Sequence, residues 1–194
     1  MQKAIRWLNC LPNPSMSPSS SPKETLINRI VRVDHAGELA ADRIYAGQMF
    51  VLGNSSTGPM ISKMWKEEKN HLDEMERLSA THNVSPSLFS PIFSIAGFVL
   101  GMGSAAVGKE AAMGCTVAVE ELIGTHYNDQ VKELLQVAPE EEKLLQTLTT
   151  MRDDELEHYE LGKSNDGEKS PFFNPFKVIV QTGCKAAIAV AAKI

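Results

Sequence analysis

The sequence predicts an all-α protein: a four-helix bundle built from two repeated helical hairpins, with additional apolar helices beside it. Three observations support this fold class. Apolar residues recur at helical spacing through most of the chain, no segment alternates as a strand does, and the chain contains an internal repeat. With 194 residues, 43% of them hydrophobic and 22% charged, the chain is long enough for one domain with a sizeable core.

The first two helices form a hairpin in this interpretation. Apolar residues keep helical spacing over about 25–52, and no proline interrupts them. The segment 53–59 is rich in Gly and Ser and ends in Pro59, which is suited to the first turn of a helix. We therefore expect a turn at 53–59 and a second helix that follows it.

The rest of the chain predicts a second hairpin and two apolar segments. The segment 78–108 contains no Asp, Glu, Lys or Arg. A further helix is expected over about 109–137, and Pro139 opens the next one. After a stretch over 162–175 that is rich in Gly, Asn, Asp and Pro, a short apolar helix closes the chain.

The N-terminus differs from the rest in composition. Residues 1–23 contain three basic residues, no acidic residue and a run of serines, which is typical of an organellar transit peptide. The alternative is a disordered tail with no targeting role. We expect residues 24–194 to form a single domain.

Composition also excludes several classes of protein. A net charge of −5, without a basic stripe interleaved with aromatic residues, gives no attraction to nucleic acid. The three cysteines are too few and too scattered for a disulfide framework or a zinc site. They indicate ordinary thiols in a reducing compartment.

The internal repeat places the same chemistry in each half of the chain. The first helix of each half carries Glu, Tyr and Gln, displaced by 82 residues: Glu38, Tyr45 and Gln48 against Glu120, Tyr127 and Gln130. The second helix of each half carries Glu-x-x-His, displaced by 87 residues: Glu68 and His71 against Glu155 and His158. Two such hairpins are expected to face each other across a pseudo-two-fold axis.

The glutamates of each hairpin are level with one another. At 1.5 Å per residue, Glu38 and Glu68 both lie about 20 Å from the turn that joins their helices. Glu120 and Glu155 both lie about 25 Å from theirs. Antiparallel helices should therefore bring each single Glu opposite the Glu-x-x-His motif of its own hairpin.

These carboxylates predict a metal centre. A buried carboxylate costs several kcal/mol unless it is neutralised or paired, and no Lys or Arg lies on the same helix faces. Two divalent irons would balance four glutamates. One Glu-x-x-His alone is typical of a solvated charge pair, but this full pattern is that of ferritin-like di-iron or di-manganese bundles. The expected metal ligands and catalytic residues are Glu38, Glu68, His71, Glu120, Glu155 and His158.

Neighbouring polar residues are assigned lesser roles. Tyr45 and Tyr127 are expected either to hydrogen-bond ligand carboxylates or line a substrate cavity, or to be ordinary core tyrosines. Asp34 and His35 are expected to orient a ligand from behind. The acidic residues next to the ligands turn about 100° away on a helix and should be solvated or lie behind the ligands: Glu67, Glu121, Asp154 and Glu157. The histidines with no carboxylate three residues earlier are expected to be non-ligands: His82 and His126.

Four motifs carry a resemblance to a known family. VDHAGE at 33–38, RIYAGQ at 43–48, CTVAVEE at 115–121 and RDDELEH at 152–158 resemble the demethoxyubiquinone hydroxylases of ubiquinone biosynthesis. The resemblance extends over about 26–194. It implies a di-iron monooxygenase that hydroxylates the quinone ring of demethoxyubiquinone with O₂ and electrons from NADH. It also implies a mitochondrial address, which agrees with the transit-peptide interpretation, and a lipid-binding protein of the same pathway as partner.

The resemblance also suggests roles within the ligand set. By analogy with related bundles, Glu68 and Glu155 would bridge the two irons, and the other four ligands would be terminal. The spacing of the residues does not establish this pairing.

An isoprenoid substrate implies access from lipid. The segment 88–108 is apolar and long enough to suggest a membrane span, but its Pro, Gly and Ser residues argue against one. We expect an interfacial helix on the matrix face of the inner membrane, assisted by the last helix. The alternative is a helix that packs only internally. Two other functions are open on the sequence alone: a ferritin-like iron oxidase or peroxide scavenger, and a non-enzymatic membrane-binding module.

Overall fold

The computed structural model describes residues 21–194, and the predicted all-α class is confirmed over this range, which contains helices and no strand. The helices run in chain order as α1 Pro22–Leu52, α2 Gly58–His82, α3 Ser90–Val107, α4 Lys109–Val137, α5 Glu142–Ser164, the 3₁₀ helix η1 Gly167–Lys169, and α6 Phe173–Ala191. Most of the predicted transit peptide, residues 1–20, lies outside the described residues.

The first helix begins slightly earlier than the apolar pattern predicts. The Ser21 hydroxyl accepts a hydrogen bond from the backbone N–H of Glu24, whose carboxylate accepts one from the backbone N–H of Ser21. This capping box, with Pro22 in the first turn, fixes the helix start. The last two residues of the segment 1–23 therefore belong to α1.

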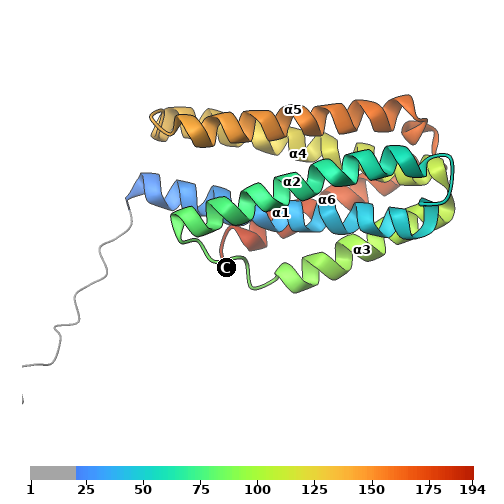
Figure 1. The fold of residues 1–194 in the computed structure, drawn as a ribbon, viewed down its shortest axis with the longest axis horizontal. Helices are drawn as coiled ribbons and strands as arrows, with labels where there is room; N and C mark the ends of the chain where they lie inside the picture. The colour runs from blue at the N-terminus through green and yellow to red at the C-terminus, as the bar shows by residue number, and fades with distance from the viewer. Residues whose placement is uncertain (1–20) are drawn as a thin grey trace, which may run out of the picture.

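Two antiparallel hairpins make the bundle, as predicted. Helix α1 packs against α2, and α4 packs against α5. Figure 1 shows these four helices with nearly parallel axes, α3 along the outer side of α1, and α6 behind. Helix α3 contacts α1, and α6 contacts mainly α4. The two apolar helices thus cover one side of the bundle.

Helix α3 lies unusually close to α1. A Cβ atom on Gly101 would lie 1.9 Å from the Ile44 carbonyl oxygen, and one on Gly97 would lie 2.5 Å from that of Ala40. Backbone-to-backbone packing at this distance requires glycine. The Gly97-x-x-x-Gly101 spacing places both glycines on the face of α3 that contacts α1.

The opposite face of α3 is open to solvent. Ile92 is 58% exposed, Ile95 68% and Val99 54%. Helix α3 is the one helix within 21–194 that is long and apolar enough to cross a membrane, by length and composition alone. Because one face is exposed, the alternative of a purely internal packing helix is wrong.

Two apolar clusters fill the ends of the bundle. One surrounds Ile30, Met75 and Leu148, and the other surrounds Ile61 and Met64. The middle of the bundle lies between them. The glutamates and histidines of the repeat occupy this layer, with an apolar cluster on either side.

Candidate metal centre

All six predicted ligands are buried in the middle of the bundle. None is more than 6% exposed, although four are carboxylates. They come from the four helices of the two hairpins: Glu38 on α1, Glu68 and His71 on α2, Glu120 on α4, and Glu155 and His158 on α5.

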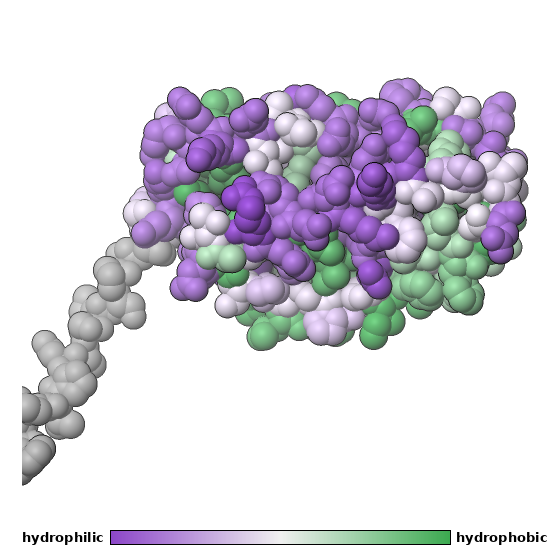
Figure 2. Space-filling model, viewed as in Figure 1, coloured by the Kyte–Doolittle hydropathy of each residue, from purple (hydrophilic) through white to green (hydrophobic). Residues whose placement is uncertain are grey.

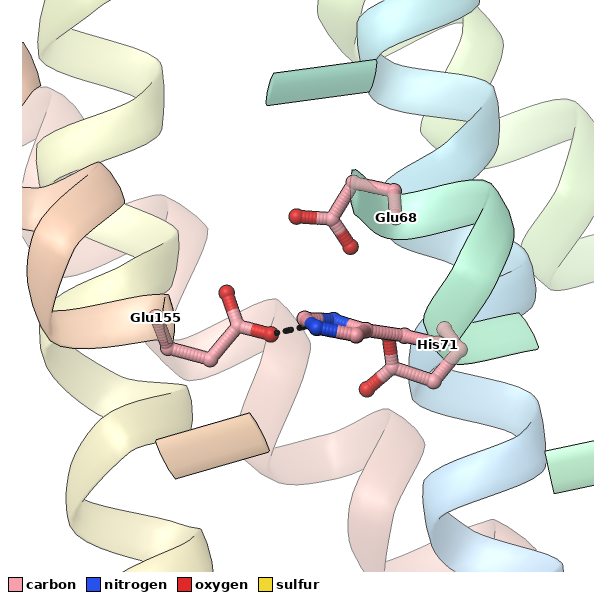
Figure 3. Close-up of side chains that lie close together, drawn as sticks. Glu68, His71 and Glu155 are labelled. Carbon is pink, nitrogen blue, oxygen red and sulfur yellow. Dashed lines mark ion pairs between the residues drawn. The ribbon is translucent and has the colours of Figure 1, made fainter. Parts of the chain in front are cut away.

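The six side chains form two overlapping groups. In each group, one ligand atom per residue lies within 4.8 Å of the others. The groups are Glu38, Glu68, His71 and Glu155, and Glu68, Glu120, Glu155 and His158. Figure 3 shows Glu68, His71 and Glu155 pointing toward one another from α2 and α5. Glu68 and Glu155 belong to both groups, an arrangement that supports the bridging role suggested by analogy.

The donor atoms of this cluster fit cations. Several buried atoms form no hydrogen bond of good geometry, although each Nδ1 lies 3.0–3.5 Å from carboxylate oxygens of the cluster. They are Glu38 Oε2, both carboxylate oxygens of Glu68, Glu155 Oε2, and the Nδ1 atoms of His71 and His158. An unsatisfied buried polar atom costs about 1–3 kcal/mol, and more if it is charged. Carboxylate oxygen and imidazole nitrogen both suit iron. Two divalent cations would therefore satisfy the orphaned atoms and balance the four carboxylates.

A carboxylate behind each imidazole fixes its orientation. His71 Nε2 lies 3.0 Å from Asp154 Oδ2, and His158 Nε2 lies 2.9 Å from Glu67 Oε2. Each partner comes from the opposite hairpin, and the repeat matches Glu67 with Asp154. With Nε2 held in this way, Nδ1 faces the cluster. The expectation that these two acidic residues lie behind the ligands is confirmed.

The two tyrosines hydrogen-bond ligand carboxylates, again across the hairpins. Tyr45 donates to Glu120 Oε1 at 2.9 Å, and Tyr127 donates to Glu38 Oε1. Tyr45 lies two helical turns from Glu38 on α1, which is too far for a hydrogen bond between them. Each tyrosine hydrogen-bonds the glutamate of the other half instead. The predicted hydrogen bonds to ligand carboxylates are therefore confirmed, and both rings also belong to the apolar clusters.

Other predicted neighbours lie away from the cluster. Asp34 accepts a hydrogen bond from Gln130 at 2.7 Å, and His126 Nε2 lies 3.6 Å from the same carboxylate. The ring nitrogen Nδ1 of His35 is buried without a hydrogen-bond partner. These contacts do not support the expected role of Asp34 and His35 in orienting a ligand.

The remaining two acidic neighbours pair with lysines. Glu121 lies 2.6 Å from Lys177 and also accepts a hydrogen bond from Gln181, both on α6. Glu157 lies 2.9 Å from Lys63 at the surface. Sequence reasoning did not identify the anchoring of α6 to α4, because only the fold brings residue 121 beside residue 177.

An apolar cavity of about 520 Å³ reaches the cluster. It lies between α1, α3, α4 and α6, and its lining includes Glu38, Glu120 and Glu155. The rest of its wall is almost wholly apolar, with residues such as Val33, Ile44, Phe93, Leu100 and Ile188. A long apolar molecule can therefore bring one end to the carboxylates.

Burial and mutual contacts shift the pKa values of the cluster strongly. Burial and the charge of Glu155 raise the pKa of Glu68 to about 8. Burial disfavours the charge on Glu155, but contacts with His158 and His71 outweigh it and lower the pKa of Glu155 to about 2. Burial also opposes protonation of the two histidines, yet their carboxylate partners raise the pKa of His71 and of His158 to about 12.

We expect metal binding to release protons. At pH 7 the metal-free protein should hold protons on His71, His158 and Glu68, since all three raised pKa values lie above 7. Burial and the charge of Glu155 also raise the pKa of Glu120 well above its usual value. A metal needs the unprotonated donors, so loading two Fe²⁺ should release at least about three protons per chain, and metal affinity should fall as the pH falls. Anaerobic calorimetry in buffers with different ionisation heats measures this number. Binding heats that do not depend on the buffer would contradict it.

The fold and the cluster together define a class. A glutamate from each of two helices and Glu-x-x-His from the other two is the ferritin-like bundle pattern. The family model described as "Ubiquinone biosynthesis protein COQ7" matches residues 25–191. The chain therefore belongs to the COQ7 family of ubiquinone biosynthesis proteins.

Curated relatives agree with this family. A Caenorhabditis elegans protein named "NADPH-dependent 3-demethoxyubiquinone 3-hydroxylase, mitochondrial" is 60% identical over 177 residues, 91% of this chain and 95% of the relative. The Saccharomyces cerevisiae "5-demethoxyubiquinone hydroxylase, mitochondrial" is 35% identical over 195 residues, 93% and 84% of the two chains. The Rhodospirillum rubrum "3-demethoxyubiquinol 3-hydroxylase" is 39% identical over 178 residues, 91% and 82%. The predicted family and enzyme class are confirmed.

Proposed function

We propose that this chain is a di-iron monooxygenase that hydroxylates the ring of demethoxyubiquinone in ubiquinone biosynthesis. The observation that carries the proposal is the apolar cavity that ends on Glu38, Glu120 and Glu155. It joins a site suited to O₂ chemistry to a space suited to a quinone with an isoprenoid tail. The relatives' names supply the substrate, and the six clustered residues supply the ligands of two irons.

The reaction replaces a ring hydrogen with a hydroxyl group. One atom of O₂ enters the C–H bond, the other leaves as water, and two electrons from a reduced nicotinamide nucleotide, with a proton, balance the step. Two ferrous ions held by the six clustered residues would supply the electrons that reduce O₂ beside the substrate. The protein orients the ligand carboxylates through Tyr45 and Tyr127 and excludes water through the apolar clusters at both ends of the bundle.

The proposed reaction requires an electron donor. The family resemblance suggested NADH, whereas the C. elegans relative is named NADPH-dependent. We propose a reduced nicotinamide nucleotide as donor. Parallel reduction assays with NADH and NADPH, under anaerobic conditions and with a demethoxyquinone present, decide between the two.

The hydroxyl oxygen should come from O₂. Turnover of iron-loaded protein under ¹⁸O₂, followed by mass spectrometry of the product, should show one labelled oxygen atom on the ring. The same reaction in H₂¹⁸O under ordinary O₂ is the control and should give unlabelled product. Label that arrives from water would refute the monooxygenase mechanism.

The cavity's surroundings support access from a membrane. Helices α3 and α6 form two of its walls, and both expose apolar residues outward, including Ile92 and Ile95 on α3 and Val178 and Ile179 on α6. Figure 2 shows hydrophobic residues along the edge formed by α3, while the face over α2 and α5 is largely hydrophilic. We propose peripheral binding to the matrix face of the inner mitochondrial membrane, with the lipid-binding partner that the resemblance implies.

Replacing Ile92, Ile95 and Val99 with serine should weaken membrane binding and leave iron binding intact. These side chains are exposed and none lines the cavity, so the bundle should not change. Flotation with liposomes that contain anionic lipid measures binding, and metal analysis measures iron. Serine at exposed positions of α2, Lys66 and Lys69, provides a control on the hydrophilic face. Unchanged flotation of the α3 variant would show that this face does not contact lipid.

A further inference from the structure

Gly37 is a glycine for which packing gives no reason. It lies in the interior of α1, directly before Glu38, and it lines the apolar cavity. A Cβ atom built on Gly37 meets no other atom within 4 Å. Gly97 and Gly101 differ, because a Cβ at either would collide with the backbone of α1.

Glycine at residue 37 lowers the stability of α1, and packing does not require it. Glycine in a helix interior is less favourable than alanine, because it loses more backbone freedom on folding. Alanine would fit at residue 37 without a clash. Gly183 on α6 also lines the cavity and its Cβ would meet no atom within 4 Å, but this residue is exposed to solvent. Open space is therefore retained inside the cavity on the α1 wall.

We propose that Gly37 determines substrate specificity by leaving room for the substituted ring against the α1 backbone. The inference rests on the proposed function and names where the ring lies. The reacting ring must approach the ligand cluster, and Gly37 is the lining residue next to Glu38. The ligand class is a flat ring with small substituents and an apolar tail, the tail lying along the apolar walls.

Substitutions of increasing size test the proposal. Gly37→Ala and Gly37→Leu are compared with Gly103→Ala and Gly103→Leu. Gly103 lies in α3, also has no atom within 4 Å of a built Cβ, and is absent from the cavity lining. The measurements are the melting temperature, the iron content, and the dissociation constant for a demethoxyubiquinone with a short isoprenoid tail.

Both alanine variants should melt about 1–4 °C higher than the wild type, because each removes a helix-interior glycine. Iron content should not change in any variant. Gly37→Leu should weaken quinone binding about 10- to 100-fold, since its side chain occupies the ring's space, and Gly37→Ala should weaken it less. The Gly103 variants should bind the quinone as the wild type does.

Ring analogues separate the ring from the tail. With tails of equal length, Gly37→Ala should discriminate against a ring that carries a methoxy group relative to one that does not. Equal losses for both rings would place the tail at Gly37 and overturn the proposal. So would unchanged affinity in Gly37→Leu, or in Gly37→Ala if the leucine variant does not fold. Wild-type protein that binds no quinone at all would refute the proposed function itself, and this inference with it.

Discussion

Replacing Glu120 with alanine should lower the iron content and abolish turnover, whereas Glu121→Ala should leave both irons bound. The two residues are neighbours on α4, but a helix turns about 100° per residue. Glu120 is 2% exposed, accepts a hydrogen bond from Tyr45 and belongs to the ligand cluster. Glu121 contacts Lys177 and Gln181 on α6.

The expected difference between the two variants is large. Loss of Glu120 would leave one cation under-coordinated in a dry core. Mutating a residue that only hydrogen-bonds a metal ligand lowers activity by up to about 100-fold, so losing a ligand itself should lower activity by at least that much. Loss of Glu121 removes a partly exposed ion pair of about 0–1 kcal/mol, which should change activity at most several-fold. Metal analysis and turnover are measured on both purified variants. An empty site in Glu121→Ala, with a full site in Glu120→Ala, would contradict the assigned helical register.

The sequence was sufficient to predict the helical bundle and the position of the ligand cluster within it. Helical spacing identifies which faces are buried, and the repeat identifies the residues that share those faces. Glu-x-x-His places two donors on one side of a helix regardless of tertiary contacts. Glu38 and Glu68 could therefore be expected at one level, and the structure brings them within one group.

Contacts between the hairpins could not be predicted in the same way. Each tyrosine reaches a glutamate of the opposite half, and each histidine is held by an acidic residue of the opposite half. Those contacts depend on the rotation of one hairpin against the other, which no local pattern encodes. A ligand carboxylate was therefore one partner that the sequence predicted for Tyr45, but the sequence did not identify Glu120 as that ligand.

The orientation of α3 also could not be predicted from the sequence. Every residue of this helix is apolar or small, so composition does not distinguish the packed face from the exposed one. The structure places Phe93 in the cavity lining, while Ile92 and Ile95 face outward. Glycines set this orientation, because only the Gly97–Gly101 face can approach α1 so closely.

Glu155→Ala should remove both irons, whereas Glu38→Ala should retain about one per chain. Glu155 belongs to both ligand groups, and Glu38 belongs to one of them. Truncating a shared ligand removes a donor atom and a negative charge from both metal positions at once. It also leaves His71 and His158 without a carboxylate that each of them contacts, at 3.2 Å and 3.4 Å.

The measurement is iron content after anaerobic loading, starting from about two irons per chain in the wild type. Glu157→Ala is a matched control on the same helix, since Glu157 is exposed and pairs with Lys63; it should bind iron as the wild type does. Neither glutamate variant should turn over substrate, because the proposed reduction of O₂ would use both ions together. The number of irons retained therefore distinguishes shared from single ligands where activity does not. If Glu155→Ala kept one iron and Glu38→Ala kept none, Glu38 and not Glu155 would hold both ions together.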